Sequence, residues 1–155
     1  MTVYADTNFF TNLLVELPQS ADADLLAIMN RERGSMPLPV CRLLNFELIN
    51  ALQRLLYEAA HGTQKIRITP ELALVAEGQF TEQLAIGSEW RKCEPDPDLL
   101  LSTFNNIVFR HTAKRGFRTY DILHVASAVA LGCDTFWTFD EKAKHLAALE
   151  GLKTS

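Results

Sequence analysis

The sequence has few cysteines and no long apolar run. Its cysteines, Cys41, Cys93 and Cys133, lie far apart, and no Cys-x-x-Cys pair occurs. This spacing excludes a disulfide framework and a paired-cysteine zinc site, and it is typical of a reducing cytoplasm. No apolar stretch approaches the roughly 20 residues of a membrane span, and the first residues lack a basic start followed by an apolar signal core. We therefore expect a cytoplasmic protein that does not enter the membrane.

Common enzyme motifs are also missing. The sequence contains no Walker loop, no dinucleotide-binding glycine fingerprint and no Gly-x-Ser-x-Gly elbow. Internal repeats, low-complexity tracts and long linkers are absent as well. A function must therefore come from side chains that the fold brings together.

Composition is that of an ordinary globular chain. The 155 residues are 48% hydrophobic and carry 15 Lys and Arg against 19 Asp and Glu, for a formal net charge of -4. This combination excludes intrinsic disorder, which requires low hydrophobicity and high net charge. A chain of this length buries roughly 68–70% of its unfolded surface on folding. We predict a single domain over residues 1–155.

The distribution of charge is more informative than its sum. Acidic residues are absent between Asp98 and Asp121. Basic residues gather in that gap: Arg110, His111, Lys114, Arg115 and Arg118. Such a segment can bind a polyanion even in a mildly acidic protein. Alternatively, the cations complement the dipole at a helix end, and charge alone leaves both interpretations open.

Hydrophobic periodicity predicts many helices and a few short strands. Strands are expected at 3–5, 36–40 and 135–139, with a fourth near 152–153. Helices are expected over 9–17, 25–29, 43–60, 99–113, 119–131 and 141–149, and from 70 towards 90. Helices between short apolar strands indicate an α/β fold, with a small central parallel sheet flanked by helices.

Four acidic residues are predicted to meet at one edge of this sheet. Asp6 directly follows the first strand, and Asp140 directly follows the predicted strand that ends at 139. Loops at the carboxyl ends of parallel strands converge on one edge, where sites form. Glu47 lies about one turn into the helix after the second strand, and Asp121 lies in the first turn of the helix before the last one. All four can therefore reach one region.

Each acid also has a purely structural explanation. Asp6 and Asp140 would serve as helix N-caps, and Asp121 would favour the dipole of a helix that is capped by Thr119. Glu47 differs because it borders the apolar face of its helix. Its carboxylate should be partly desolvated, which is costly unless a cation or hydrogen bonds offset the burial.

Taken together, the four acids indicate a metal site. Carboxylates ~4 Å apart repel by about 4 kcal/mol at an effective dielectric of 20, so a cluster needs a compensating charge. Oxygen ligands favour Mg²⁺ or Mn²⁺ over zinc. Such ions commonly serve phosphodiester hydrolysis, by activating water and stabilising the leaving oxygen. The basic segment would then lie at the rim of the site, ready for phosphates.

Three polar side chains near the acids are candidate supports. Asn8 and Thr138 are placed to hydrogen-bond the carboxylates and fix their rotamers, although local capping explains them equally well. Thr138 and Asp140 would share one face of a strand. His124 follows Asp121 by three residues and would contact the scissile phosphate or position water. The favoured alternative is a histidine packed between its helix and the sheet.

These motifs resemble those of PIN-domain nucleases, and above all VapC-type toxins of toxin–antitoxin pairs. The resemblance spans nearly the whole chain and rests on Tyr4 to Asn8, Glu47 within a helix, Asp121 to Ala128, and Phe136 to Asp140. It implies an α/β/α sandwich whose acidic cluster binds Mg²⁺ or Mn²⁺ and hydrolyses RNA. By position, Asp6, Asp121 and Asp140 would be the metal ligands, and Glu47 would complete the catalytic site.

The resemblance also implies partners. VapC-type proteins of this size are usually dimers silenced by a small antitoxin, and the complex binds its own promoter through the antitoxin. We therefore expect a metal-dependent endoribonuclease, the toxin of a type II pair, that forms a homodimer. Candidate RNA contacts are Arg110, Lys114, Arg115, Arg118 and His124.

Two other functions are kept as alternatives. One is a PIN-fold RNA-processing enzyme, or a non-catalytic module that binds RNA or protein, outside any toxin–antitoxin pair. The other is a phosphatase-type domain that uses Asp6 as a nucleophile. The second ranks last, because the haloacid-dehalogenase pattern has another aspartate where this chain has Asn8.

Overall fold

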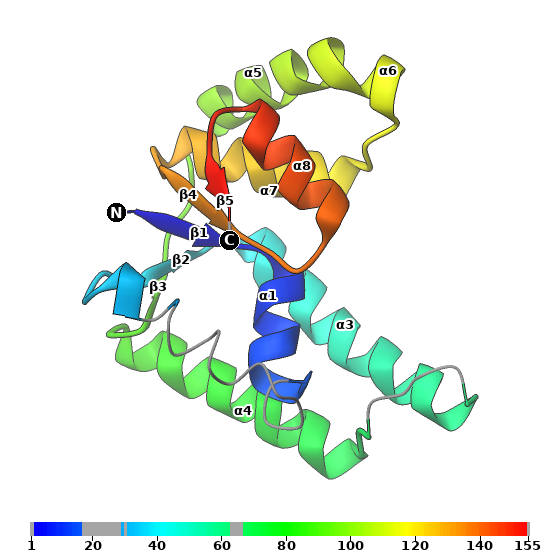
Figure 1. The fold of residues 1–155 in the computed structure, drawn as a ribbon. Coiled ribbons are helices and arrows are strands. Elements are labelled where there is room, and N and C mark those ends of the chain that lie inside the picture. Colours follow the sequence, from blue (N-terminus) through cyan, green and yellow to red (C-terminus); the bar gives the residue numbers. More distant parts are fainter. Residues whose placement is uncertain (1, 17–28, 30, 63–66, 155) are drawn as a thin grey trace.

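A computed structural model describes residues 2–16, 29, 31–62 and 67–154 (Figure 1). The strands are β1 (Val3–Ala5), β2 (Leu38–Val40), β3 (Trp90–Lys92), β4 (Thr135–Trp137) and β5 (Lys153–Thr154). The helices are α1 (Thr7–Thr11), α3 (Arg42–Ala60), α4 (Pro70–Ile86), α5 (Pro97–Ile107), α6 (Ala113–Arg115), α7 (Thr119–Ala130) and α8 (Glu141–Leu149). π-Helical turns extend α1 as η1 (Asn12–Glu16) and join α5 to α6 as η3 (Val108–Thr112).

All strand pairings are parallel. One sheet has the order β1-β4-β5, and a second pairs β2 with β3. In the register, Tyr4 lies opposite Phe136 and Leu38 lies opposite Trp90. Because β1 also contacts β2, the two sheets form one small layer (Figure 1). The carboxyl ends of β1, β2 and β4 therefore share an edge.

Helices cover both faces of this layer, so the expected α/β/α sandwich is confirmed. In Figure 1, α1, α3 and α4 lie below the strands, and α5, α7 and α8 lie above them. Alternation along β1 sends Val3 and Ala5 into the lower core with Phe9 and Phe10, and Tyr4 into the upper core. Each face thus buries its own apolar cluster.

Helix starts follow local capping chemistry. The Asp96 side chain accepts a hydrogen bond from the Leu99 amide, and Pro97 follows at the first helical position of α5. Thr69 caps α4 in the same way, with Pro70 next. Asp6 and Asp140 cap α1 and α8. The capping explanation of these two acids is therefore correct.

The sequence-based elements are largely confirmed, with differences at their boundaries. The stretch predicted as helical from 70 towards 90 ends at Ile86, and Trp90 begins β3, a strand that the sequence analysis missed. Two charged residues within only three positions hide this strand, which forms by pairing with β2. β4 ends at Trp137, so Asp140 does not directly follow a strand. The cap of α7 is Arg118 and not Thr119, and Arg118 makes no side-chain capping bond.

The helix predicted over 25–29 lies outside the described residues except for Met29. Within the described ranges, no helix combines the length and apolar character needed to cross a bilayer.

Candidate active site

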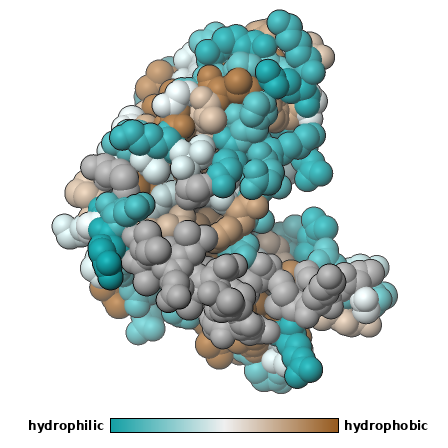
Figure 2. Space-filling model, viewed as in Figure 1, coloured by the Kyte–Doolittle hydropathy of each residue, from teal (hydrophilic) through white to brown (hydrophobic). Residues whose placement is uncertain are grey.

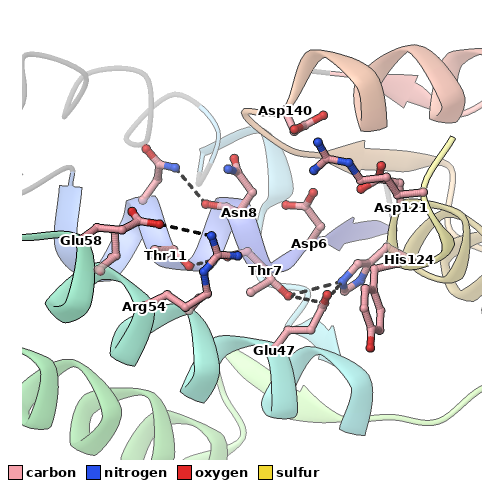
Figure 3. A pocket seen from close by; sticks show the side chains of 15 residues that line it. Asp6, Thr7, Asn8, Thr11, Glu47, Arg54, Glu58, Asp121, His124 and Asp140 are labelled. Carbon is pink, nitrogen blue, oxygen red and sulfur yellow. Dashed lines mark hydrogen bonds and ion pairs between the residues drawn. The ribbon is translucent and has the colours of Figure 1, made fainter. Parts of the chain in front are cut away.

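All four predicted acids line one cavity of about 360 Å³ at the carboxyl edge of the sheet. Asp6 comes from the end of β1, Glu47 from α3, Asp121 from α7 and Asp140 from the start of α8. Figure 3 shows them facing the same space, with Glu47 on the opposite side from Asp121 and Asp140. The prediction that the four acids meet is confirmed. The volume is at the low end of small-ligand sites, about 300–1,000 Å³.

Asp6 is buried and held by its surroundings. Its Oδ1 accepts a hydrogen bond of 2.9 Å from the Phe9 amide, and the Thr138 hydroxyl also bonds to its carboxylate. Burial raises the pKa of Asp6, and the charge of Asp140 adds to that rise. His124 and the hydrogen bonds oppose the rise without cancelling it. Asp6 is thus fixed in orientation but destabilised as an anion.

Thr138 connects Asp6 to the segment that carries Asp140. Its hydroxyl oxygen accepts a bond of 3.0 Å from the Asp140 amide, while Asp140 accepts one of 2.9 Å from the Ala143 amide. Thr138 therefore supports both acids through its hydroxyl group. The basis of this support differs from the prediction, because Thr138 lies beyond the end of β4 and shares no strand face with Asp140.

Asp121 is half-buried in the first turn of α7. Burial raises its pKa, and the nearby charge of Asp140 raises it further. Arg118, three residues earlier, opposes the rise and lines the same cavity. The charge of Asp140 therefore acts on both Asp6 and Asp121, in addition to the larger effect of burial.

Glu47 belongs to a separate hydrogen-bonded chain. The Thr7 hydroxyl donates to its Oε2 at 2.8 Å, and Nε2 of His124 contacts the same oxygen. On the other side of the imidazole ring, Nδ1 lies 2.9 Å from the hydroxyl of the fully buried Tyr4. Burial alone would raise the pKa of Glu47, but His124 and Thr7 outweigh it and lower the pKa. Glu47 is thus stabilised as an anion.

His124 is packed and connected at once. Its exposed fraction is 4%, and its ring lies 5.8 Å from the Tyr4 ring, centre to centre. The favoured prediction of a packed histidine is therefore correct. It is incomplete, because the ring also lines the cavity and bonds to Glu47.

Asn8 supports the site by another route than expected. Its side-chain oxygen accepts a bond of 3.0 Å from the Phe139 amide, directly before Asp140. This bond ties α1 to the start of α8 across the edge of the sheet. Asn8 therefore positions the segment that carries an acid, instead of bonding to a carboxylate itself.

The predicted basic contacts separate into two groups. Arg118 lines the cavity, whereas the lining formed by the described residues does not include Arg110, Lys114 or Arg115. Arg110 and His111 both pair with Glu150, at 2.6 and 2.7 Å. Arg115 lies 2.9 Å from His145. Figure 2 shows a largely hydrophilic surface over the upper helices. Among the described residues of the basic segment, Arg118 is the one that lines the cavity.

Several cavity residues were missed by the sequence analysis. Thr7 sits in the same motif as Asp6 but received no role, and Arg54 and Tyr120 line the cavity as well. The i+7 spacing from Glu47 to Arg54 is a helical signal that would have placed them on one face. Tyr4 gave no signal, since a buried tyrosine on a strand is equally a core residue.

The donor chemistry of the site fits a hard divalent cation. Asp6, Asp121 and Asp140 supply carboxylate oxygens, and burial, with a smaller contribution from the charge of Asp140, raises the pKa values of Asp6 and Asp121. In the described part of the chain, however, no three carboxylate, imidazole or thiol groups are arranged as an ion-binding cluster. The chemistry therefore supports a metal, while the arrangement does not form a coordination shell.

Solved structures share this architecture over almost their full lengths. VapC20 of Mycobacterium tuberculosis, a sarcin-ricin loop cleaving toxin, is 16% identical with a TM-score of 0.62 and covers 97% of this chain and 96% of that chain. The chain has the PIN fold. VapBC2 of Rickettsia felis, bound to a promoter DNA fragment, is also 16% identical with a TM-score of 0.62, and the match covers 100% of this chain and 98% of that chain. VapBC-1 of nontypeable Haemophilus influenzae is 13% identical with a TM-score of 0.62, and the match covers 100% of this chain and 97% of that chain.

Similarity at the level of sequence is low. No family model matches the chain, and no curated protein does. Identities of 13–16% to the solved structures establish the PIN fold and no more.

Proposed function

We propose that this protein is a metal-dependent endoribonuclease. The observation that carries the proposal is the convergence of Asp6, Asp121 and Asp140 from three elements on one cavity, where burial and, to a smaller extent, the charge of Asp140 raise the pKa of the other two. Capping does not explain this convergence, because a helix cap needs no second acid nearby. A cation that offsets the repulsion does.

Asp6, Asp121 and Asp140 would hold Mg²⁺ or Mn²⁺ through carboxylate oxygens. When bound, such an ion lowers the pKa of water and neutralises charge on a phosphate. The protein contributes orientation. Hydrogen bonds from backbone amides fix the carboxylates of Asp6 and Asp140, and the Thr138 hydroxyl bonds to the Asp6 carboxylate and to the Asp140 amide. These restraints keep the acids aimed at the cavity before any ion or substrate arrives.

Glu47 and Arg118 act on the substrate side of the cavity. Thr7 and His124 engage Oε2 of Glu47 and keep the carboxylate charged, so the group can orient a water molecule or accept its proton. Arg118 is exposed at the same cavity and binds a backbone phosphate. Together they place a nucleophile and a phosphodiester in one space.

We further propose that the protein is a toxin that acts as a homodimer and is silenced by a small antitoxin. The full-length likeness to a sarcin-ricin loop cleaving toxin and to VapBC proteins supports this assignment. RNA is the proposed substrate for the same reason. A non-catalytic RNA-binding or protein-binding module is the second candidate, since no ion-binding cluster is formed among the described residues.

The test is cleavage of total RNA by the purified protein in Mg²⁺, in Mn²⁺ and in EDTA, beside Asp121→Asn. We expect discrete cuts that need the metal and disappear in the variant. RNA binding without cleavage in any metal would instead favour the non-catalytic module. Toxin status is tested separately, because induced expression should arrest growth and Asp121→Asn should relieve the arrest.

A further inference from the structure

A second cavity of about 410 Å³ opens beside the acids. It shares five lining residues with the first cavity: Thr7, Glu47, Ala51, Arg54 and Tyr120. The two spaces therefore adjoin along these residues, so a ligand chain that passes the acids would lie beside this side cavity. Figure 3 shows Glu47 and Arg54 extending from the same helix, α3, and both residues line both cavities.

Two exposed aromatic side chains distinguish the side cavity. Phe46 on α3 is 68% exposed, and Tyr120 at the start of α7 is 58% exposed. Both line the cavity, together with exposed Asn50 and Arg54. Phe46, Asn50 and Arg54 follow one another at four-residue spacing, so they form one row along α3. Along α3 the row therefore presents the aromatic ring of Phe46, then the amide of Asn50, then the guanidinium of Arg54.

We propose that the side cavity binds an unpaired nucleobase of the RNA, next to the phosphate that is cleaved. This rests on the proposed ribonuclease function and names a subsite for its substrate. Each base offers an aromatic face for stacking on Phe46 or Tyr120 and a polar edge for the Asn50 amide. Arg54 pairs with Glu58 at 3.2 Å on the surface, a weak exposed ion pair that a phosphate can replace.

The combination favours single-stranded RNA over a protein segment. This row presents aromatic, amide and guanidinium groups, which match the face of a base, its polar edge and a phosphate. A base in a duplex is stacked and paired, so it must be unpaired to enter a side cavity. Tyr120 lies directly before Asp121, which places a stacking surface next to the proposed metal ligands.

The experiment measures the affinity of the full-length Asp121→Asn protein for a labelled single-stranded RNA octamer in EDTA, so that nothing is cleaved. Phe46→Ala and Tyr120→Ala are compared with Tyr120→Phe, which keeps the ring. Phe109→Ala is the matched control, because Phe109 is 85% exposed and outside both cavities. We expect about 5-fold to 100-fold weaker binding for the two alanine variants and no change for the other two.

A series of octamers with one abasic position identifies the base itself. One abasic position should weaken binding by the same factor as Tyr120→Ala, and combining the two should give no further loss. If the parent binds RNA but these variants and abasic positions have no effect, the subsite is wrong while the ribonuclease function stands. If the variants instead change the oligomeric state in gel filtration, the cavity is a protein interface and the proposal is overturned. If the parent binds no RNA in EDTA or in Mg²⁺, the proposed function itself fails.

Discussion

Nε2 of His124 contacts Oε2 of Glu47, from a ring whose Nδ1 lies 2.9 Å from the Tyr4 hydroxyl. Both ring nitrogens are therefore engaged, and the imidazole is fixed between the core and the cavity. The pKa of the Tyr4 hydroxyl is raised well above its usual range, mainly by burial, so the group stays protonated and can donate to Nδ1. That arrangement leaves the Nε2 proton for Glu47.

Replacing His124 by Gln should reduce turnover more than substrate binding. The ring is buried and bonds to Oε2 of Glu47, so we expect it to act mainly by orienting that carboxylate. We expect kcat to fall about 10-fold to 100-fold with KM nearly unchanged, as for other residues that support a catalytic group. Steady-state kinetics on a defined RNA measures kcat and KM separately.

His111→Gln is the matched control for this variant. His111 pairs with Glu150 at 2.7 Å, also partly buried, but lies outside the cavity. Each substitution should cost about 1–3 kcal/mol of stability through a lost buried hydrogen bond. Equal losses of kcat in the two variants would mean that His124 matters only for folding.

Asp6→Asn should stabilise the metal-free protein at neutral pH. Asparagine keeps the capping oxygen for the Phe9 amide but removes a charge that burial disfavours. Because the folded pKa of Asp6 is raised above its ordinary value of 3.8, its contribution to stability is largest below that pH and is lost as the pH rises through the folded pKa. The advantage of the variant should therefore vanish towards pH 4. Melting temperatures against pH in EDTA test this, and a less stable variant at pH 7 would show that the charge of Asp6 is stabilising.

Divalent ions should raise the melting temperature of the wild type. An ion at 100 times its dissociation constant contributes about 2.7 kcal/mol, or roughly 5–10 °C for a chain of this size. Asp121→Asn and Asp140→Asn should abolish the shift, because each removes a proposed ligand. Thermal scans in Mg²⁺, in Mn²⁺ and in NaCl of equal ionic strength measure it. A shift that survives both substitutions would place the ion elsewhere.

Arg118 and Arg110 should behave oppositely when each is replaced by Ala. Arg118 lines the cavity, so its loss should weaken RNA binding and reduce the slope of log affinity against log salt by about 0.7. Arg110 instead pairs with Glu150, whose side chain is 5% exposed, so its loss should lower stability and leave RNA affinity unchanged. Salt titrations of RNA binding distinguish the two. An equal loss of RNA affinity in Arg110→Ala would contradict this and indicate that the whole basic segment contacts RNA.

Local patterns were enough to place the acids. A short apolar run before Asp6 predicted β1, and helical spacing placed Glu47 and Asp121 on α3 and α7, as observed. The rule that parallel strands end at one edge then brought the acids to one cavity. These features are predictable because each depends on neighbours within a few residues.

Features that depend on distant partners were not predictable. β3 exists because Trp90 and Lys92 pair with Leu38 and Val40, some fifty residues earlier in the chain. The contact between Tyr4 and His124 likewise joins residues 120 positions apart. Neither leaves a periodic signal in the sequence, so the structure was needed to find them.

The most direct test of the account asks whether Asp6 and Asp140 are more than helix caps. Asp96 caps α5 through the same kind of hydrogen bond from a backbone amide, but it lies outside the cavity. Asp96→Asn is therefore the matched control. RNA cleavage rates in Mg²⁺ are compared for Asp6→Asn, Asp140→Asn and Asp96→Asn, each first shown to be folded. The account predicts that the first two lose at least about 100-fold in rate, in line with the loss of a charged catalytic group, while Asp96→Asn keeps wild-type activity. Wild-type cleavage by all three variants would contradict it and leave these acids as caps alone.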